Sequence, residues 1–455
     1  MNFDTIAAIS TGLIPGGIGI VRVSGDKAVA VCEPLVRLKK LSLSQAKANH
    51  LYYGQIADQN GVIDEALIAV LKAPHSYTAE DTVELQCHGG PFVLQKVLDA
   101  VLKAGARLAE PGEFTKRAFL NGRLDLSEAE AVMDLISAGS ELARETALKQ
   151  LQGKNSALIR RLRAGILEKT AFLEAALDDP EHYELADYEK EAEPFIQDLI
   201  REIEGLLKTA DDGKVLVEGI RTAIIGRPNV GKSSFMNCLL GYERAIVTQI
   251  PGTTRDTIEE SFRFQDLVLR LSDTAGIRES ADVVEKIGID RALEAVKEAD
   301  LVLLIADGSK ALSEEDEALL ALCEGKTRLM LLNKSDLGLK EDPAALEARY
   351  GCPCYGISAK NGSGLEAVLE KIRTLFRLSE IRQQPLLVTN LRHKELLREA
   401  LTSLEYAEKT LQSHAPEDLL TIDLMDAYRA LGRILGEEVE EDLVNEIFSK
   451  FCMGK

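Results

Sequence analysis

The 455-residue chain has no apolar run of the 18 or so residues that a transmembrane helix needs. Its first residues, MNFDTIAAISTG, carry no basic segment ahead of an apolar core, as a secretory signal would. Its seven cysteines are odd in number, scattered, and without a repeated Cys-x-x-Cys, which argues against a disulfide framework and a zinc site. The sequence therefore predicts a cytoplasmic protein with no membrane segment.

Basic residues are outnumbered: 54 Lys and Arg face 74 Asp and Glu, a net charge of −20. Such a chain is not a general nucleic-acid coat, so we expect no DNA partner, and any RNA contact needs a local basic patch. The hydrophobic content of 45% and charged content of 28% are ordinary for a globular protein. The length predicts about two to four domains.

The residue pattern changes along the chain and predicts a multidomain protein. Residues 1–120 have a mixed α/β pattern, in which 18–23 and 83–87 resemble strands and 92–104 a helix. Residues 121–217 and 379–455 are helical and acidic, with a break near Pro180, and are compatible with one domain that the segment between them interrupts. Residues 218–378 alternate strands with helices, which predicts a parallel sheet covered on both faces; its strands are expected at 222–225, 267–271, 301–305, 329–332 and 354–357.

The segment Gly226-Arg-Pro-Asn-Val-Gly231-Lys232-Ser233 fits the P-loop pattern between a predicted strand and a predicted helix. Glycines allow backbone N–H groups to curl around phosphate oxygens, and the helix N-terminus favours the anion. Lys232 is expected to reach the β- and γ-phosphates and Ser233 to ligate Mg²⁺. The segment predicts a nucleotide site.

Three further motifs follow predicted strands of the same domain. Asp273-Thr274-Ala275-Gly276 can hold Mg²⁺ through water and meet a γ-phosphate. The Asp336 carboxylate of Asn333-Lys334-Ser335-Asp336 can accept two hydrogen bonds from guanine, which adenine cannot supply. Ser358-Ala359-Lys360 can offer a backbone N–H to the guanine oxygen. Together these motifs resemble those of translation-factor-type GTPases and predict GTP as the nucleotide.

Hydrolysis needs a group that orients water, and Ile277 stands where Ras-like proteins have a glutamine. Arg278 and Glu285 lie just downstream, but the residues alone favour solvated loop charges for both. In the Thr-rich loop 245–256, Thr254 can ligate Mg²⁺, and hard oxygens can hold an alkali cation that supplies positive charge. The nucleotide-binding residues predicted are Asn229, Val230, Gly231, Lys232, Ser233, Ser234, Thr248, Gln249, Ile250, Pro251, Gly252, Thr253, Thr254, Asp273, Thr274, Ala275, Gly276, Asn333, Lys334, Asp336, Ser358, Ala359 and Lys360.

Blocks outside the nucleotide motifs resemble a known family from end to end. They are PGGIGIVRVSG at 15–25, VELQCHGGP at 83–91, PGEFTKRAFLN at 111–121 and the terminal FCMGK. With the P-loop motifs, they resemble the MnmE (TrmE) family of bacterial tRNA-modifying GTPases, within the TrmE-Era-EngA-like superfamily. The resemblance implies an N-terminal tetrahydrofolate-binding-like α/β domain that forms a homodimer, an all-α helical domain, and a Ras-like P-loop G domain inserted in it.

The same resemblance implies the reaction. The GTPase would act with the flavoprotein MnmG, which carries FAD, on carbon 5 of the wobble uridine of certain tRNAs. A 5-formyl- or methylene-tetrahydrofolate would supply the carbon, and the product would be a carboxymethylaminomethyl- or aminomethyl-uridine. K⁺ would bind the switch loop and drive G-domain dimerisation and hydrolysis.

Site residues follow from the resemblance by position. It places K⁺ contacts at Asn229, Thr248, Ile250 and Thr253, and Mg²⁺ contacts at Ser233 and Thr254. It makes Glu285 the residue that orients water, and Arg278 and Cys452 further candidate catalytic residues. The implied folate contacts are Arg22, Glu84, Arg123 and Lys455.

Two other readings remain open. A ribosome-assembly or regulatory RNA-binding GTPase would do no covalent chemistry, but it calls for a basic appendage, and residues 379–455 hold 9 basic and 15 acidic residues. A folate-binding dimer whose GTPase only signals is equally compatible with the motifs. The fate of wobble-uridine modification when Cys452 is replaced separates this last reading from the enzyme.

Overall fold

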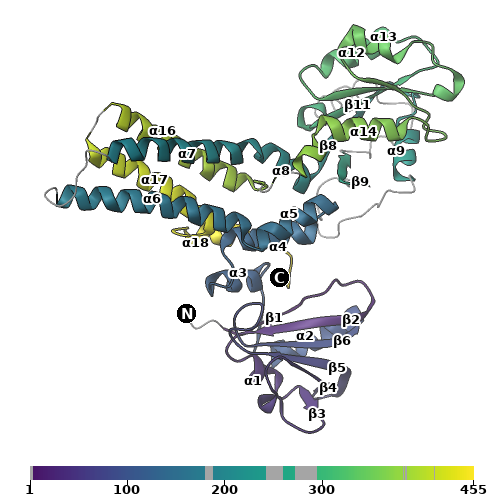
Figure 1. Ribbon diagram of the computed structural model, residues 1–455. Coiled ribbons are helices and arrows are strands. Elements are labelled where there is room, and N and C mark those ends of the chain that lie inside the picture. The colour runs from purple at the N-terminus through teal and green to yellow at the C-terminus, as the bar shows by residue number, and fades with distance from the viewer. Residues whose placement is uncertain are drawn as a thin grey trace. The chain divides into compact units, whose positions relative to one another are not determined.

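The computed structural model describes residues 4–179, 188–241, 260–271, 295–382, 384, 387–413 and 416–454 (Figure 1). The chain divides into two compact units. Unit 1 comprises Met1–Met133, Gln150–Ala171 and Tyr428–Lys455, and unit 2 comprises Asp134–Lys149 and Phe172–Ala427. Within the described residues, no helix is long and apolar enough to cross a membrane.

Unit 1 is built on a seven-stranded sheet in the order β3-β4-β5-β6-β2-β1-β7. All neighbours pair antiparallel except β1 and β7, which are parallel. The strands predicted at 18–23 and 83–87 are confirmed as parts of β2 and β6. The strands are β1 (Ile6–Ile9), β2 (Gly16–Ser24), β3 (Val36–Leu38), β4 (His50–Asp58), β5 (Gly61–Leu71), β6 (Thr82–Gly89) and β7 (Arg107–Leu108).

Helices α1 (Ala28–Cys32) and α2 (Pro91–Lys103) bury the apolar residues of this sheet in one core (Figure 1). Helix α2 begins with Pro91, whose missing N–H is not needed at a first helical position, and Gly105 follows its end at a φ of +115°. The helix predicted at 92–104 is thus confirmed. The C-terminal helix α18 (Glu441–Ser449) packs its Phe448 with Leu126 and Ala129 at the start of α4 (Leu126–Ser137).

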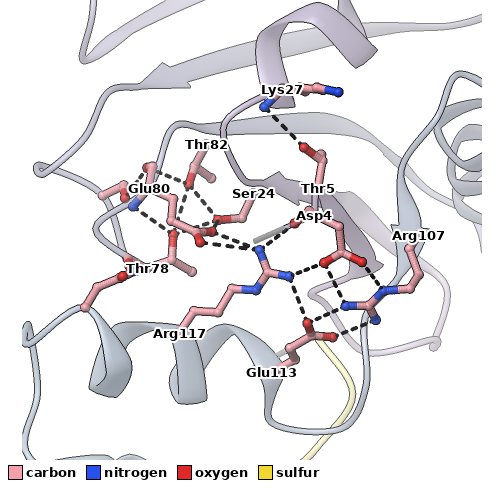
Figure 2. Close-up of polar contacts among 12 residues, drawn as sticks. Asp4, Thr5, Ser24, Lys27, Thr78, Glu80, Thr82, Arg107, Glu113 and Arg117 are labelled. Carbon is pink, nitrogen blue, oxygen red and sulfur yellow. Dashed lines mark hydrogen bonds and ion pairs between the residues drawn. The ribbon is translucent and has the colours of Figure 1, made fainter. Parts of the chain in front are cut away.

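Helix α3 (Glu113–Leu120) is fixed by a network of two arginines and three carboxylates (Figure 2). Arg117, 2% exposed, donates to the Asp4 carbonyl at 2.7 Å and carboxylate at 2.9 Å, to Glu113 at 2.9 Å, and to Glu80 at 3.3 Å. Burial opposes ionisation of Glu113, but its bonds from Arg107, the Glu110 amide and Arg117 outweigh burial and lower its pKa. The network joins α3 to the N-terminal segment and to the β6 side of the sheet.

Unit 2 contains a six-stranded sheet in the order β13-β12-β11-β8-β10-β9. In β11, alternate residues enter two different cores. Leu303 packs with α9 (Lys232–Leu240) and α14 (Leu365–Leu375), and Leu304 packs with α12 (Glu314–Leu322) and α13 (Pro343–Tyr350). These two cores confirm the prediction that helices cover both faces of the sheet. The sequence indicated this because a strand that is buried on both sides has a continuous run of apolar residues. The strands are β8 (Ile220–Ile225), β9 (Glu260–Phe264), β10 (Leu267–Leu271), β11 (Leu301–Asp307), β12 (Arg328–Asn333) and β13 (Cys354–Gly356).

The sequence predicted a parallel sheet and no strand at 260–264, and the structure differs in both respects. Strand β9 pairs antiparallel with β10, and Phe264 lies opposite Leu267. Only Gln265, at a φ of +53°, and Asp266 connect the two strands. A connection of two residues permits only an antiparallel hairpin. The sheet is therefore mixed, with β9 on its edge.

Helices complete the two units. In unit 2, α7 packs along α16, where Gln197 donates to Glu408 at 3.0 Å. The predicted break near Pro180 agrees with the end of α6 at Asp178. The remaining helices are α5 (Glu141–Leu151), α6 (Lys154–Asp178), α7 (Tyr188–Lys208), α8 (Ala210–Glu218), α9 (Lys232–Leu240), α12 (Glu314–Leu322), α13 (Pro343–Tyr350), α14 (Leu365–Leu375), α15 (Leu378–Ile381), α16 (Leu391–Gln412) and α17 (Glu417–Leu435).

Candidate functional site

The predicted P-loop connects β8 to α9, the context that the motif requires. Gly226 has a φ of +152°, and a Cβ there would lie 2.2 Å from the Ile305 carbonyl oxygen. Gly231 has a φ of +100°, and a Cβ there would lie 2.2 Å from Asn333 Nδ2. Only glycine fits either position, so the loop passes tightly over the carboxyl ends of the strands.

Lys232 lies inside this loop. Its Nζ donates to the carbonyl oxygens of Gly226 at 2.6 Å and Arg227 at 2.8 Å. Burial lowers the pKa of its ammonium group. Ser233 and Ser234 are exposed in the first turn of α9. A cation and two hydroxyl groups thus gather at a helix N-terminus, which suits phosphate with a divalent cation.

Asn333, at the end of β12, joins the P-loop to the segment after β13. Its Nδ2 donates to the Val230 carbonyl at 2.8 Å, and its Oδ1 accepts from the Ala359 N–H at 2.9 Å. The side chain is buried, and both of its polar ends are therefore satisfied by backbone. The structure gives Asn333 a bracing role between these two predicted nucleotide-binding segments.

Lys334 and Asp336 follow on the short helix η2 (Ser335–Leu337) and its N-cap. Lys334 Nζ donates to Asp307 Oδ2 at 2.7 Å and to the Asn229 carbonyl at 3.2 Å. Burial opposes ionisation of Asp307, but its bonds from Lys334 and Ser309 outweigh burial and lower its pKa to about 2. Asp336 Oδ1 accepts from Ser358 Oγ at 2.8 Å, so its other oxygen is available to a ligand.

Some of these residues line a cavity of about 1080 Å³ in unit 2; Lys232 and Ser233 are not in its wall. Sequence reasoning missed Cys238 and Glu366 in its wall, and Asp307, which holds Lys334. Asp307 had a usable signal, since it ends a fully buried strand at the carboxyl edge where α/β sheets bind ligands. The predicted residues in the wall are Gly231, Ser234, Asn333, Lys334, Asp336, Ala359 and Lys360.

Several predicted site residues lie outside the described residues. They comprise the switch-loop positions, the motif after β10 and its two downstream charges, and the terminal lysine. They are Thr248, Gln249, Ile250, Pro251, Gly252, Thr253, Thr254, Asp273, Thr274, Ala275, Gly276, Arg278, Glu285 and Lys455.

A second group of predicted residues meets in unit 1. Arg22 of β2 lies opposite Glu84 of β6, and its Nε donates to Glu84 Oε1 at 2.9 Å. Its side chain is 13% exposed, and its buried Nη1 has no hydrogen-bond partner among the described residues. The Arg22 guanidinium lies 5.6 Å from the Phe114 ring centroid, and exposed Arg123 lies 4.7 Å from that of Tyr77. The donor without a partner, beside a second cation, suits an anionic ligand.

The C-terminal segment is held against the same unit by its backbone. The Gly112 N–H donates to the Cys452 carbonyl at 3.3 Å, and Ser10 Oγ donates to the Gly454 carbonyl at 3.0 Å. A Cβ on Gly454 would lie 2.2 Å from the Ile9 carbonyl oxygen, so only glycine allows this approach. The Cys452 side chain is nevertheless exposed. A fixed backbone thus presents a thiol to solvent.

Comparisons with known proteins identify the family of the chain. The family model described as the MnmE helical domain matches residues 126–452, and that of the GTP-binding protein TrmE N-terminus matches residues 5–123. Curated relatives named tRNA modification GTPase MnmE include those of Lachnoclostridium phytofermentans, 47% identical, and Geobacillus kaustophilus, 46% identical; each match covers 100% of both chains. The Bacillus subtilis relative of that name is 45% identical over 99% of this chain and 100% of its own. The chain therefore belongs to the MnmE family of tRNA modification GTPases.

Proposed function

We propose that this protein is a tRNA-modifying GTPase whose activity depends on K⁺. Together with an FAD-carrying MnmG partner, it would modify carbon 5 of the wobble uridine of certain tRNAs, using a tetrahydrofolate one-carbon donor. Membership of the family supports a GTPase that acts in tRNA modification. The observation that carries the proposal is the cavity that joins the P-loop to Asp336 and Lys360. We also propose that the chain divides into segments 1–120, 121–217, 218–378 and 379–455, and that the protein is located in the cytoplasm.

The P-loop residues and the cavity residues have distinct proposed tasks. Lys232 would leave its carbonyl partners to neutralise the β- and γ-phosphates, and Asp336 would accept two hydrogen bonds from guanine. Mg²⁺ would be held by Ser233 and Thr254, and would neutralise charge on the phosphates when bound. We assign the orientation of water to Glu285, as the family resemblance implies; Ile277 has no polar group for this role.

A homodimer is proposed through unit 1. Four large apolar side chains are exposed near the start of β2 and the start of α2: Leu13, Ile14, Ile18 and Phe92, at 63%, 74%, 65% and 75%. Gly16 pairs with Gly89, which brings these two element ends together. Burial of this patch in a second copy would remove the apolar surface from water.

We expect K⁺ to stimulate GTP hydrolysis roughly tenfold or more over Na⁺ at equal ionic strength, because a cation beside the phosphates stabilises the charge of the transition state. Asn229 is the described residue of the proposed K⁺ site, with an exposed side chain and a φ of +63°. Asn229→Gly keeps this backbone conformation without the amide oxygen, and Asn229→Asp keeps an oxygen. Steady-state hydrolysis in KCl and NaCl should show the stimulation lost in the glycine variant and largely kept in the aspartate variant.

Nucleotide affinity is the control for that measurement. The affinity for a fluorescent GDP in NaCl should be similar in the wild type and both variants, because the lost K⁺ contact is expected to slow hydrolysis and not to weaken nucleotide binding. Equal rates of the wild type in the two salts would refute the K⁺ mechanism and favour a GTPase activated by a partner protein.

The fixed tail of unit 1 supports a catalytic role for Cys452. We expect Cys452→Ser to abolish wobble-uridine modification in the reconstituted system with MnmG and tRNA, because a hydroxyl is a far weaker nucleophile than a thiolate at neutral pH. GTP hydrolysis and the folded state should be unchanged, since the side chain is exposed. The check is mass spectrometry of the tRNA nucleosides, with Met453→Leu as a matched control in the same tail. Normal modification by the serine variant would remove Cys452 from the chemistry.

The folate part of the proposal rests on Arg22 and its neighbours. The buried Nη1 of Arg22 and the exposed guanidinium of Arg123 can donate to the carboxylates of a folate. Glu84 holds Arg22 through one oxygen and keeps the other for an N–H of the ligand. A bound folate would supply the carbon unit near the tail that carries Cys452.

A further inference from the structure

The ring of Tyr77 contacts both arginines of the proposed folate site. The guanidinium carbon of Arg22 lies 5.3 Å from its centroid, and that of Arg123 lies 4.7 Å away. The ring is half-buried and packs against a small core that includes Ile6 and Phe114. Its hydroxyl oxygen lies 2.9 Å from Thr115 Oγ1 on α3, at hydrogen-bond distance. The position of the ring is thus fixed from two directions.

Two guanidinium groups beside one ring repel each other. Among the described residues, Arg22 forms an ion pair with Glu84, whereas Arg123 forms none. Exposed Arg123 makes no side-chain hydrogen bond with a described residue. The negative face of an aromatic ring attracts a guanidinium group. The Tyr77 ring therefore offsets part of the repulsion and restricts the rotamers of Arg123, which would otherwise be ordered only by a ligand.

We propose that Tyr77 is a positioning residue that pre-organises Arg22 and Arg123 for the anionic groups of a folate. The inference rests on the proposed folate function of this site. Tyr77 acts through the electrostatic potential of its ring face, and the two arginines make the contacts with the carboxylates. Loss of the ring potential should weaken folate binding even when the ring keeps its shape.

Fluorinated phenylalanines test this role, because fluorine weakens the negative ring face with little change in shape. The full-length protein would carry Phe, 4-fluoro-Phe, 3,5-difluoro-Phe or 3,4,5-trifluoro-Phe at position 77, and calorimetry would give its affinity for 5-formyltetrahydrofolate. We expect affinity to fall stepwise, roughly tenfold across the series. The same series at Tyr406, on α16 of unit 2, should leave affinity unchanged.

The Arg123→Met background supplies the second arm. If Tyr77 acts on Arg123, the decline along the fluorine series should become shallower in that background, since part of the interaction is already absent. A flat series with a normal loss of affinity in Arg22→Met would overturn the role of Tyr77 and leave the folate site intact. Unchanged folate affinity in both Arg22→Met and Glu84→Gln would instead refute the folate site itself, and the Tyr77 role with it.

Discussion

Asp336→Asn is expected to weaken GTP binding roughly a thousandfold and to create affinity for xanthosine triphosphate. The carboxylate would accept two hydrogen bonds from guanine, and an amide would set its NH₂ against the guanine amino group. Xanthine carries a carbonyl oxygen in place of that amino group, and the amide can donate to it. Titration of fluorescent GTP, ATP and xanthosine triphosphate analogues would measure the exchange of specificity.

The surroundings of Asp336 make this substitution mild for the fold. Ser358 Oγ donates to Asp336 Oδ1 at 2.8 Å, and an asparagine Oδ1 can accept the same bond. Asp342→Asn is the matched control: Asp342 caps α13 by accepting from the Ala344 N–H, and asparagine is an equally good cap. GTP affinity equal to that of the wild type in Asp336→Asn would mean that another group reads the guanine edge.

The nucleotide site was predictable because its parts are local in sequence. The P-loop occupies eight consecutive residues, and the two motifs for the base each follow a strand whose apolar run is plain. Parallel strands bring their carboxyl ends to one edge, so the sheet order alone places these motifs together. Strand β9 escaped prediction because its alternating Phe262 and Phe264 lie on a short segment without the long apolar run of a central strand.

The second site was predictable only by family resemblance, and its physical causes are not local. Tyr77 meets Arg22 and Arg123 across separations of more than 40 residues, which no periodicity in the sequence reveals. Likewise, the positive charge of Arg117 is satisfied by Glu113 of the same helix and by Asp4 and Glu80, which only the completed sheet brings to α3. The resemblance predicts Arg22, Glu84 and Arg123 as site residues, and it does not indicate Tyr77, whose ring contacts both arginines.

Arg117→Met is expected to destabilise α3 and the adjoining part of the sheet by about 3–5 kcal/mol, because it leaves the buried Glu80 carboxylate without its cation. Glu80 is 8% exposed, and its carboxylate also accepts a hydrogen bond from Ser24 Oγ at 2.8 Å (Figure 2). Arg107→Met is the matched control. Arg107 also pairs with Asp4 and Glu113, but its side chain is 42% exposed, so its loss should cost about 1 kcal/mol or less.

Amide hydrogen exchange is the suitable measurement, because a chain with two compact units need not unfold in one step. Protection should fall in α3 and β1 of Arg117→Met, while α9 and α14 of unit 2 stay as in the wild type. Adding Glu80→Gln to Arg117→Met should restore part of the loss, since the double variant no longer buries that unpaired charge. Equal effects of the Arg117 and Arg107 substitutions would show that burial of the cation does not decide the stability of α3.

The same two variants connect α3 to the proposed folate site, because Thr115 of α3 contacts the Tyr77 hydroxyl. If Arg117→Met weakens folate binding and Arg107→Met does not, the buried network supports the ligand site through this contact.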